Sequence, residues 1–170
     1  MSAKNILFLL TLQPNPRFVK QINYLSHHSK VSVLYFARNT MVSYEKEFEK
    51  SVITKKLSTI SNKKYLLRII SFIKCLPLLK AHIKSSEIDT IIFDKIDALI
   101  LFWLLKIRYP FFRTELTRIV ETPDLKDLNF RRGFLGWIYR IFEKYLFNHH
   151  TDKLIVTSQK YYDDYYSDFF

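Results

Sequence analysis

The sequence opens on a short apolar run that is followed at once by a polar turn. Residues 6–10 are all apolar, without the alternation of a half-exposed strand, which predicts a strand buried on both faces. Asn15 is a good capping residue and Pro16 suits the first helical position, so we expect a helix over residues 15–28. A buried strand, a turn and a helix are typical of the start of a parallel α/β sheet.

The same alternation of strand and helix patterns continues along the chain. Further strands are predicted at 31–37, 52–57, 88–94, 118–121 and 154–157, with a polar loop or short helix over 38–50. Helices are predicted at 62–84, 98–107 and 134–149, and Ser158 is expected to cap a last short helix. We therefore predict an α/β fold: a single Rossmann-like domain over residues 1–170, with a parallel sheet of six or seven strands and helices on both faces.

The longest helical pattern, residues 62–84, contains basic residues and no acidic residue. Its predicted apolar stripe consists of Tyr65, Ile69, Phe72, Leu76, Leu79 and Ile83. Pro77 is expected to kink the helix or split it in two. The basic residues considered for a membrane surface are Lys63, Lys64, Arg68, Lys74 and Lys80. Either they snorkel from a helix that covers the sheet, or they rest on an anionic membrane while apolar neighbours dip into it.

Glycine is scarce, and its scarcity excludes the common phosphate-binding loops. The 170 residues include 2 glycines, Gly133 and Gly136, both in a predicted helical context. A dinucleotide fingerprint or a P-loop needs glycines so that the backbone approaches the phosphate. Cys75 is the single cysteine, so no internal disulfide forms, and the 5 dispersed histidines give no zinc-ligand spacing. We therefore predict no metal and no cofactor.

The chain is strongly basic, with 27 Lys and Arg against 16 Asp and Glu and a net charge of +11. This excess favours an anionic partner such as nucleic acid, phospholipid headgroups or a phosphorylated substrate, although a solvated basic surface gives the same total. The sequence shows no secretory signal and no run of about 18 apolar residues that could span a bilayer. A cytoplasmic location is therefore expected.

Polar side chains follow several of the predicted strands, where open parallel sheets bind ligands. The residues expected to line such a cleft are Arg17, Asn15, Asp94, Glu121, Asp124 and Ser158. An arginine with carboxylates and hydroxyls suits a polyhydroxylated ligand that carries one anionic group. Structural alternatives are an ion pair for Arg17, helix caps for Asp94 and Ser158, and a turn for Asp124.

Several segments, in order and spacing, resemble the N-terminal domain of family 4 glycosyltransferases, which have the two-domain GT-B fold. The opening strand followed by NPRFVKQINYL, and then VSVLYFAR, resembles the start of that domain. IDTIIFDKID resembles its fourth strand, and RIVETPDL its strand that ends in an acidic residue before Asp-Leu. FEKYLFNHHTDKLIVTSQKYYDDYY resembles the helix and strand that close the domain. The resemblance spans essentially the whole chain.

The resemblance implies a retaining transfer of sugar from a nucleotide-sugar to a saccharide or lipid-linked acceptor. In this family the N-terminal domain mainly binds the acceptor, and the C-terminal domain binds the donor. The resemblance therefore implies that residues 1–170 lack the donor site and are inactive alone, and that a nucleotide-sugar binds only if a C-terminal domain is supplied. Many members place a donor-contacting histidine where this chain has Pro123, so no catalytic residue is assigned.

Two hypotheses from different classes follow. The first is the acceptor-side half of a transferase for cell-surface polysaccharide, peripheral at the inner face of the cell membrane. Arg17 would contact the acceptor, and Glu121 and Asp124 would line the cleft. The second is a non-enzymatic basic module that binds nucleic acid or an acidic protein. The basic residues of 62–84 lie among apolar residues rather than in a polar groove, which argues against nucleic acid.

Overall fold

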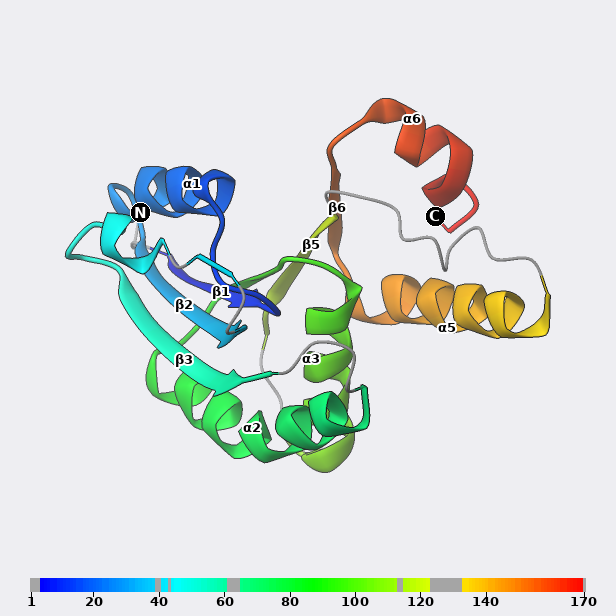
Figure 1. Cartoon of the computed structure of the whole chain (residues 1–170), viewed down its shortest axis with the longest axis horizontal. Coiled ribbons are helices and arrows are strands. Elements are labelled where there is room, and N and C mark those ends of the chain that lie inside the picture. Colours follow the sequence, from blue (N-terminus) through cyan, green and yellow to red (C-terminus); the bar gives the residue numbers. More distant parts are fainter. Residues whose placement is uncertain are drawn as a thin grey trace.

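The computed structural model describes residues 4–38, 41–42, 44–60, 65–112, 115–122 and 133–169, with no side-chain description for residues 65 and 66. Its centre is a six-stranded, all-parallel sheet with the strand order β3-β2-β1-β4-β5-β6 (Figure 1). The strands are β1 (Asn5–Leu10), β2 (Lys30–Ala37), β3 (Ile53–Thr59), β4 (Thr90–Phe93), β5 (Thr117–Thr122) and β6 (Lys153–Val156). The prediction of a Rossmann-like parallel sheet is confirmed.

Helices cover both faces of the sheet. One face carries α1 (Pro16–Ser26), and the other carries α2 (Tyr65–Ser85), α3 (Ile96–Arg108) and α5 (Phe134–His150) (Figure 1). Residues of β1 alternate between the two sides: Ile6, Phe8 and Leu10 pack with α1, whereas Leu7 and Leu9 pack with the α2 and α3 layer. This double burial explains why the first strand reads as a continuous apolar run.

The β2–β3 connection and the β3 edge are polar. A short 3₁₀ helix, η1 (Glu45–Glu47), lies in the segment predicted as a loop or short helix. Strand β3 is mostly exposed, and its Lys55 and Lys56 are the kind of residue that protects an edge strand from pairing with another chain. The third strand was predicted to begin one residue earlier and to end two residues sooner than β3 does.

Helix α2 continues through Pro77, so of the two predicted outcomes, a kink or a split, the split does not occur. Pro77 is exposed, while Phe72, Leu76 and Leu79 anchor the helix to the sheet from both sides of it. A mid-helix proline costs about 3 kcal/mol, and each fully buried large apolar side chain contributes about 1.5–3 kcal/mol. Tertiary packing therefore outweighs the local defect. Ile69, predicted on the buried stripe, is 50% exposed.

The C-terminal part of the chain packs on α5. The short helix α6 (Gln159–Tyr161) leads into a π-helical turn, η2 (Tyr162–Tyr166). Tyr165 donates a hydrogen bond to the buried carboxylate of Glu143, and the Tyr166 hydroxyl lies 3.3 Å from that of Thr122. Burial raises the pKa of Tyr166 to about 12. These two tyrosines therefore face the core.

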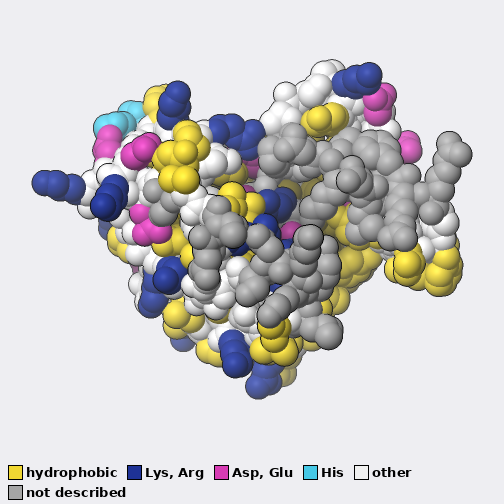
Figure 2. Space-filling view, in the orientation of Figure 1, with side chains coloured by type: hydrophobic (Ala, Val, Ile, Leu, Met, Phe, Trp, Pro, Cys, Tyr) yellow, Lys and Arg dark blue, Asp and Glu magenta, His cyan; other side chains and the backbone are white. Residues whose placement is uncertain are grey.

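Helix α5 carries an apolar stripe of Phe134, Ile138, Ile141 and Tyr145, and all four side chains are exposed. The side buried against the domain instead carries Gly136, Glu143, Leu146 and Phe147. Figure 2 shows apolar side chains at the end of the molecule where α5 projects. Because the buried side includes a polar residue, Glu143, apolar periodicity alone does not identify the inner face of this helix.

The described helices include none that is long and apolar enough to cross a membrane.

Paired substitutions in α2 test its orientation. Leu79 is fully buried, so Leu79→Ala should lower the free energy of unfolding by about 2–5 kcal/mol. Leu67 is 51% exposed, so Leu67→Ala should change it by less than about 0.5 kcal/mol. Urea unfolding followed by circular dichroism measures both values. Equal effects would contradict the packing of α2 described here.

Candidate functional site

The candidate site lies at the carboxyl edge of the sheet, near the point where the strand order reverses between β1 and β4. Three links join the segments there. Arg17 pairs with Glu121, Thr11 with Asp94, and Gln13 with the backbone of Arg38. Segments from β1, β2, β4 and β5 thus meet at this edge, as the strand pattern predicts.

The first link is an ion pair between α1 and β5. An Nη atom of Arg17 lies 2.6 Å from Oε1 of Glu121. The arginine side chain is 41% exposed and the glutamate side chain 8% exposed. The guanidinium also lies over the Phe18 ring, 5.3 Å from its centroid. Arg17 was considered either for an ion pair or for a ligand contact, and the structure shows the ion pair. The exposed part of the Arg17 side chain still faces solvent.

The Glu121 carboxylate is only half used by the protein. Its second oxygen, Oε2, is buried and has no hydrogen-bond partner among the described residues. A buried charged acceptor without a donor costs about 1–3 kcal/mol or more, so such an atom is a candidate for a ligand donor. Next to it, the partly exposed Arg17 offers N–H donors in a fixed planar fork.

Asp94 joins the ends of β1 and β4. Its carboxylate accepts hydrogen bonds from the Thr11 backbone N–H at 3.1 Å and from the Thr11 hydroxyl at 3.0 Å. Lys95 lies 3.6 Å away. Burial raises the pKa of Asp94, while Lys95 and the Thr11 bonds act in the opposite direction. Lys95, not Asp94, is the capping position of α3, so the helix-cap interpretation of Asp94 is wrong.

Asn15 and Ser158 cap helices. The Asn15 side chain accepts a hydrogen bond from the Phe18 N–H at 3.0 Å, with Pro16 at the start of α1, as predicted. The Ser158 hydroxyl accepts one from the Lys160 N–H at 3.2 Å and caps α6, also as predicted. Capping gives both residues a structural role, and it places the start of α1, and with it Arg17, beside β5.

Two residues at this edge, Gln13 and Arg38, were not among those predicted to line the cleft. Gln13 holds the end of β2: its amide donates to the Arg38 carbonyl at 2.8 Å and accepts from the Arg38 N–H at 2.7 Å. Burial and the nearby Arg68 lower the pKa of Arg38. The position of Gln13, between the first strand and the helix cap Asn15, placed it at this edge. Its residue type did not single it out, because glutamine is common in polar turns.

Arg68 was considered for a membrane surface, but the structure places it elsewhere. Its side chain is 19% exposed and lies 3.7 Å from Asp97 of α3. It also lies close enough to Arg38 to lower the pKa of that residue. Arg68 thus faces Asp97 and Arg38 near the carboxyl edge of the sheet, rather than the outward side of α2.

The remaining predicted residues divide into two groups. Asp124, Lys63 and Lys64 lie outside the described residues, as does Pro123. Lys74 is exposed on α2, and the Lys80 ammonium lies 4.1 Å from the centroid of the Tyr109 ring. Among the described residues, no three His, Cys, Asp or Glu side chains gather closely enough to hold a metal ion.

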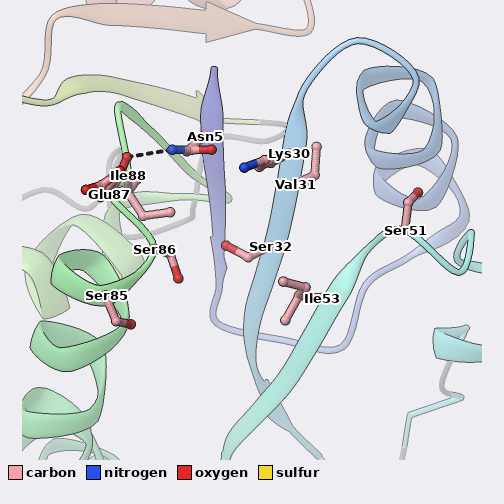
Figure 3. Close-up of a pocket in the computed structure, with 10 residues that line it drawn as sticks. All are labelled: Asn5, Lys30, Val31, Ser32, Ser51, Ile53, Ser85, Ser86, Glu87 and Ile88. Carbon is pink, nitrogen blue, oxygen red and sulfur yellow. Dashed lines mark hydrogen bonds between the residues drawn. The ribbon is translucent and has the colours of Figure 1, made fainter. Parts of the chain in front are cut away.

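A hollow of about 440 Å³ lies at the opposite, amino edge, between the starts of β1, β2 and β3 and the end of α2 (Figure 3). The Asn5 amide there donates to the Glu87 carbonyl at 3.0 Å, and the Ser32 hydroxyl lies 2.9 Å from Nε2 of His82. Burial, and then Lys55, lowers the pKa of His82. Because these polar groups already serve the protein, the hollow is a weaker candidate than the carboxyl edge.

A solved structure shares this fold over nearly the whole chain. It is sucrose-phosphate synthase from Thermosynechococcus elongatus, with a TM-score of 0.58 and 13% sequence identity. The match covers 95% of this chain and 45% of that one, so the chain spans less than half of the synthase. No protein-family model and no curated protein matches the sequence. At this identity the likeness concerns the fold alone, a parallel, Rossmann-like α/β sheet.

The Thr11–Asp94 link is testable through stability. Thr11→Val removes the hydroxyl that favours the charged form of a buried carboxylate, and should destabilise the protein by about 1–3 kcal/mol at pH 7. Because burial already raises the Asp94 pKa, the loss should shrink as the pH falls towards 4 and the carboxyl binds a proton. Urea unfolding across this pH range measures the effect.

Thr59→Val, at the exposed end of β3, is the matched control and should change stability by less than about 0.5 kcal/mol at either pH. A pH-independent loss in Thr11→Val would mean that the hydroxyl does not act through Asp94.

Proposed function

We propose that the chain is the acceptor-binding half of a retaining glycosyltransferase that uses a nucleotide-sugar donor in the synthesis of cell-surface polysaccharide. The observation that carries the proposal is the Arg17–Glu121 pair at the carboxyl edge of a glycosyltransferase-like sheet. Oε2 of Glu121 accepts a hydrogen bond from an acceptor hydroxyl, and the exposed part of Arg17 contacts a second hydroxyl or an anionic group. The assignment to family 4 rests on the sequence motifs.

The donor site is proposed to lie outside these 170 residues. Two observations support this division. The chain has no glycine-rich loop for a nucleotide phosphate, and it aligns with 45% of sucrose-phosphate synthase. The 170 residues should then bind an acceptor saccharide or lipid-linked saccharide without transferring sugar to it.

The proposal includes a peripheral location at the inner face of the cell membrane. The outward side of α2 supports it: Leu67, Ile69, Ile70 and Ile73 are each about half exposed, and Lys74 is exposed beside them. Figure 2 shows basic and apolar side chains together at the bottom of the view, where α2 lies in Figure 1. Apolar residues among cations, with no acidic residue in the helix, suit an anionic lipid surface.

Acceptor binding is tested with an array of bacterial-type oligosaccharides and lipid-linked saccharides. The unmodified chain should bind a subset of the array. Glu121→Gln removes the charged acceptor at nearly constant shape and should weaken this binding by about tenfold to a hundredfold, since a hydrogen bond to a charged group contributes about 1.5–3 kcal/mol.

Glu47→Gln, which removes the same charge from the exposed η1, should bind as the unmodified chain does. Unmodified chain that binds no saccharide, or equal binding by Glu121→Gln, would contradict the proposed site. Sugar transfer from a nucleotide-sugar by these residues alone would contradict the proposed division between two domains.

Membrane association is tested by vesicle flotation. The chain should float with vesicles of equal parts phosphatidylglycerol and phosphatidylcholine, and not with pure phosphatidylcholine. The triple variant Lys63→Glu, Lys64→Glu, Lys74→Glu should lower the bound fraction, because each basic residue near an anionic surface contributes about 1 kcal/mol. Equal flotation with both vesicles would contradict the membrane part, and salt-sensitive binding to an oligonucleotide that exceeds vesicle binding would favour the nucleic-acid module instead.

A further inference from the structure

A second hollow, of about 460 Å³, lies where α2 and α3 end, at the amino edge of the sheet and away from the candidate acceptor site. Its lining is basic and aromatic and contains no carboxylate: Lys80, Lys84, Arg108, Tyr109, Pro110, Phe111 and Phe112. Nothing in the proposed acceptor function uses these residues.

Two of the three cations of this hollow lie beside the same ring, that of Tyr109. The Lys80 ammonium lies 4.1 Å from the centroid of Tyr109, and Cζ of the Arg108 guanidinium lies 5.7 Å from it. Lys84, one helical turn beyond Lys80, is exposed. In the described part of the chain, no carboxylate pairs with Lys80, Lys84 or Arg108. Three positive charges therefore line the hollow without a protein counter-charge.

Helix dipoles account for only part of this arrangement. Lys84 and Arg108 lie in last turns, where a positive side chain is favoured by the partial charge of about −0.5 at a helix C-terminus. Two such ends amount to about one negative charge, against three positive side chains. The balance is positive, so the hollow attracts an anion, and phosphate is the group that such clusters commonly bind.

The residues at the rim of the hollow favour a phosphate that belongs to a lipid headgroup over one that belongs to a soluble compound. Phe111 is 93% exposed, and Ile107, one residue before Arg108, is 57% exposed. An aromatic ring that projects into solvent beside cations suits the headgroup level of a bilayer, where the ring enters the acyl boundary and the cations stay at the phosphates. A soluble phosphate compound would leave Phe111 in water.

We propose that the hollow formed by Lys80, Lys84, Arg108 and Tyr109 binds the phosphate of an anionic phospholipid, with Phe111 inserted beside the headgroup. This inference rests on the proposed membrane association and names its ligand. Of the basic residues considered from the sequence it keeps Lys80, and it adds Lys84 and Arg108 at the ends of α2 and α3.

The test is flotation of the full chain with vesicles of equal parts phosphatidylglycerol and phosphatidylcholine. Lys84→Glu combined with Arg108→Glu reverses two exposed cations and leaves the Lys80–Tyr109 contact in place. The double variant should lower the partition coefficient by about tenfold or more. Lys55→Glu combined with Lys56→Glu makes the same charge change on the exposed β3 edge and should lower it by less than about threefold.

Phe111→Ser separates a lipid headgroup from a free phosphate. It should weaken vesicle binding several-fold while leaving any binding of inorganic phosphate, measured by NMR titration, unchanged. Vesicle binding that Phe111→Ser does not alter would overturn the lipid assignment and leave a site for soluble phosphate compounds.

The possible failures are distinguishable. If the unmodified chain floats but the two double variants lose equally, membrane association stands and this site is overturned, because total charge alone explains the binding. If the unmodified chain does not float with anionic vesicles, the membrane association itself fails, and the lipid site fails with it. Neither result bears on saccharide binding at the carboxyl edge.

Discussion

The candidate site depends on the buried link between Thr11 and Asp94. Two hydrogen bonds join the ends of β1 and β4, the adjacent strands between which the sheet changes its direction of growth. Open α/β sheets have their ligand crevice at the carboxyl ends of such strands. The Thr11–Asp94 link therefore fixes the backbone from which the neighbouring loops start. The Asn15 cap then starts α1 at a position from which Arg17 reaches Glu121 on β5. The Asp94 carboxylate, whose pKa is raised by burial, thus has a structural role. The carboxylate oxygen without a hydrogen-bond partner among the described residues is Oε2 of Glu121.

The strands and helices followed from the sequence because parallel strands buried on both faces leave unbroken apolar runs, as residues 6–10 show. The caps at Asn15 and Ser158 were local, and local chemistry was enough to predict them. The partner of Arg17 was not predictable, since the pairing joins residues that are distant in sequence. Likewise, α2 is not split at Pro77, and α5 buries the side that carries Glu143, because packing against other elements, not periodicity, decides whether a helix continues and which side it buries.

Basic residues lie in two regions of the molecule with different surroundings. At the carboxyl edge, Arg17 and Arg68 are paired with carboxylates that hold them in place. At the ends of α2 and α3, three cations line a hollow, two of them beside the Tyr109 ring, and none pairs with a carboxylate in the described part of the chain. A polar edge of paired charges suits a hydroxyl-rich ligand, whereas unpaired cations beside an exposed phenylalanine suit a lipid surface. The fold thus separates the proposed acceptor site from the proposed membrane contact.

The central claim is that a saccharide binds at the carboxyl edge of this sheet. The most direct measurement is an amide NMR titration of the isotopically labelled chain with the saccharide that binds best on the array. The account predicts shift changes at the ends of β1 and β5 and in the first turn of α1, centred on Thr11, Arg17 and Glu121. Shift changes centred instead on Asn5, Ser32 and Ser86, around the hollow at the amino edge, would contradict it.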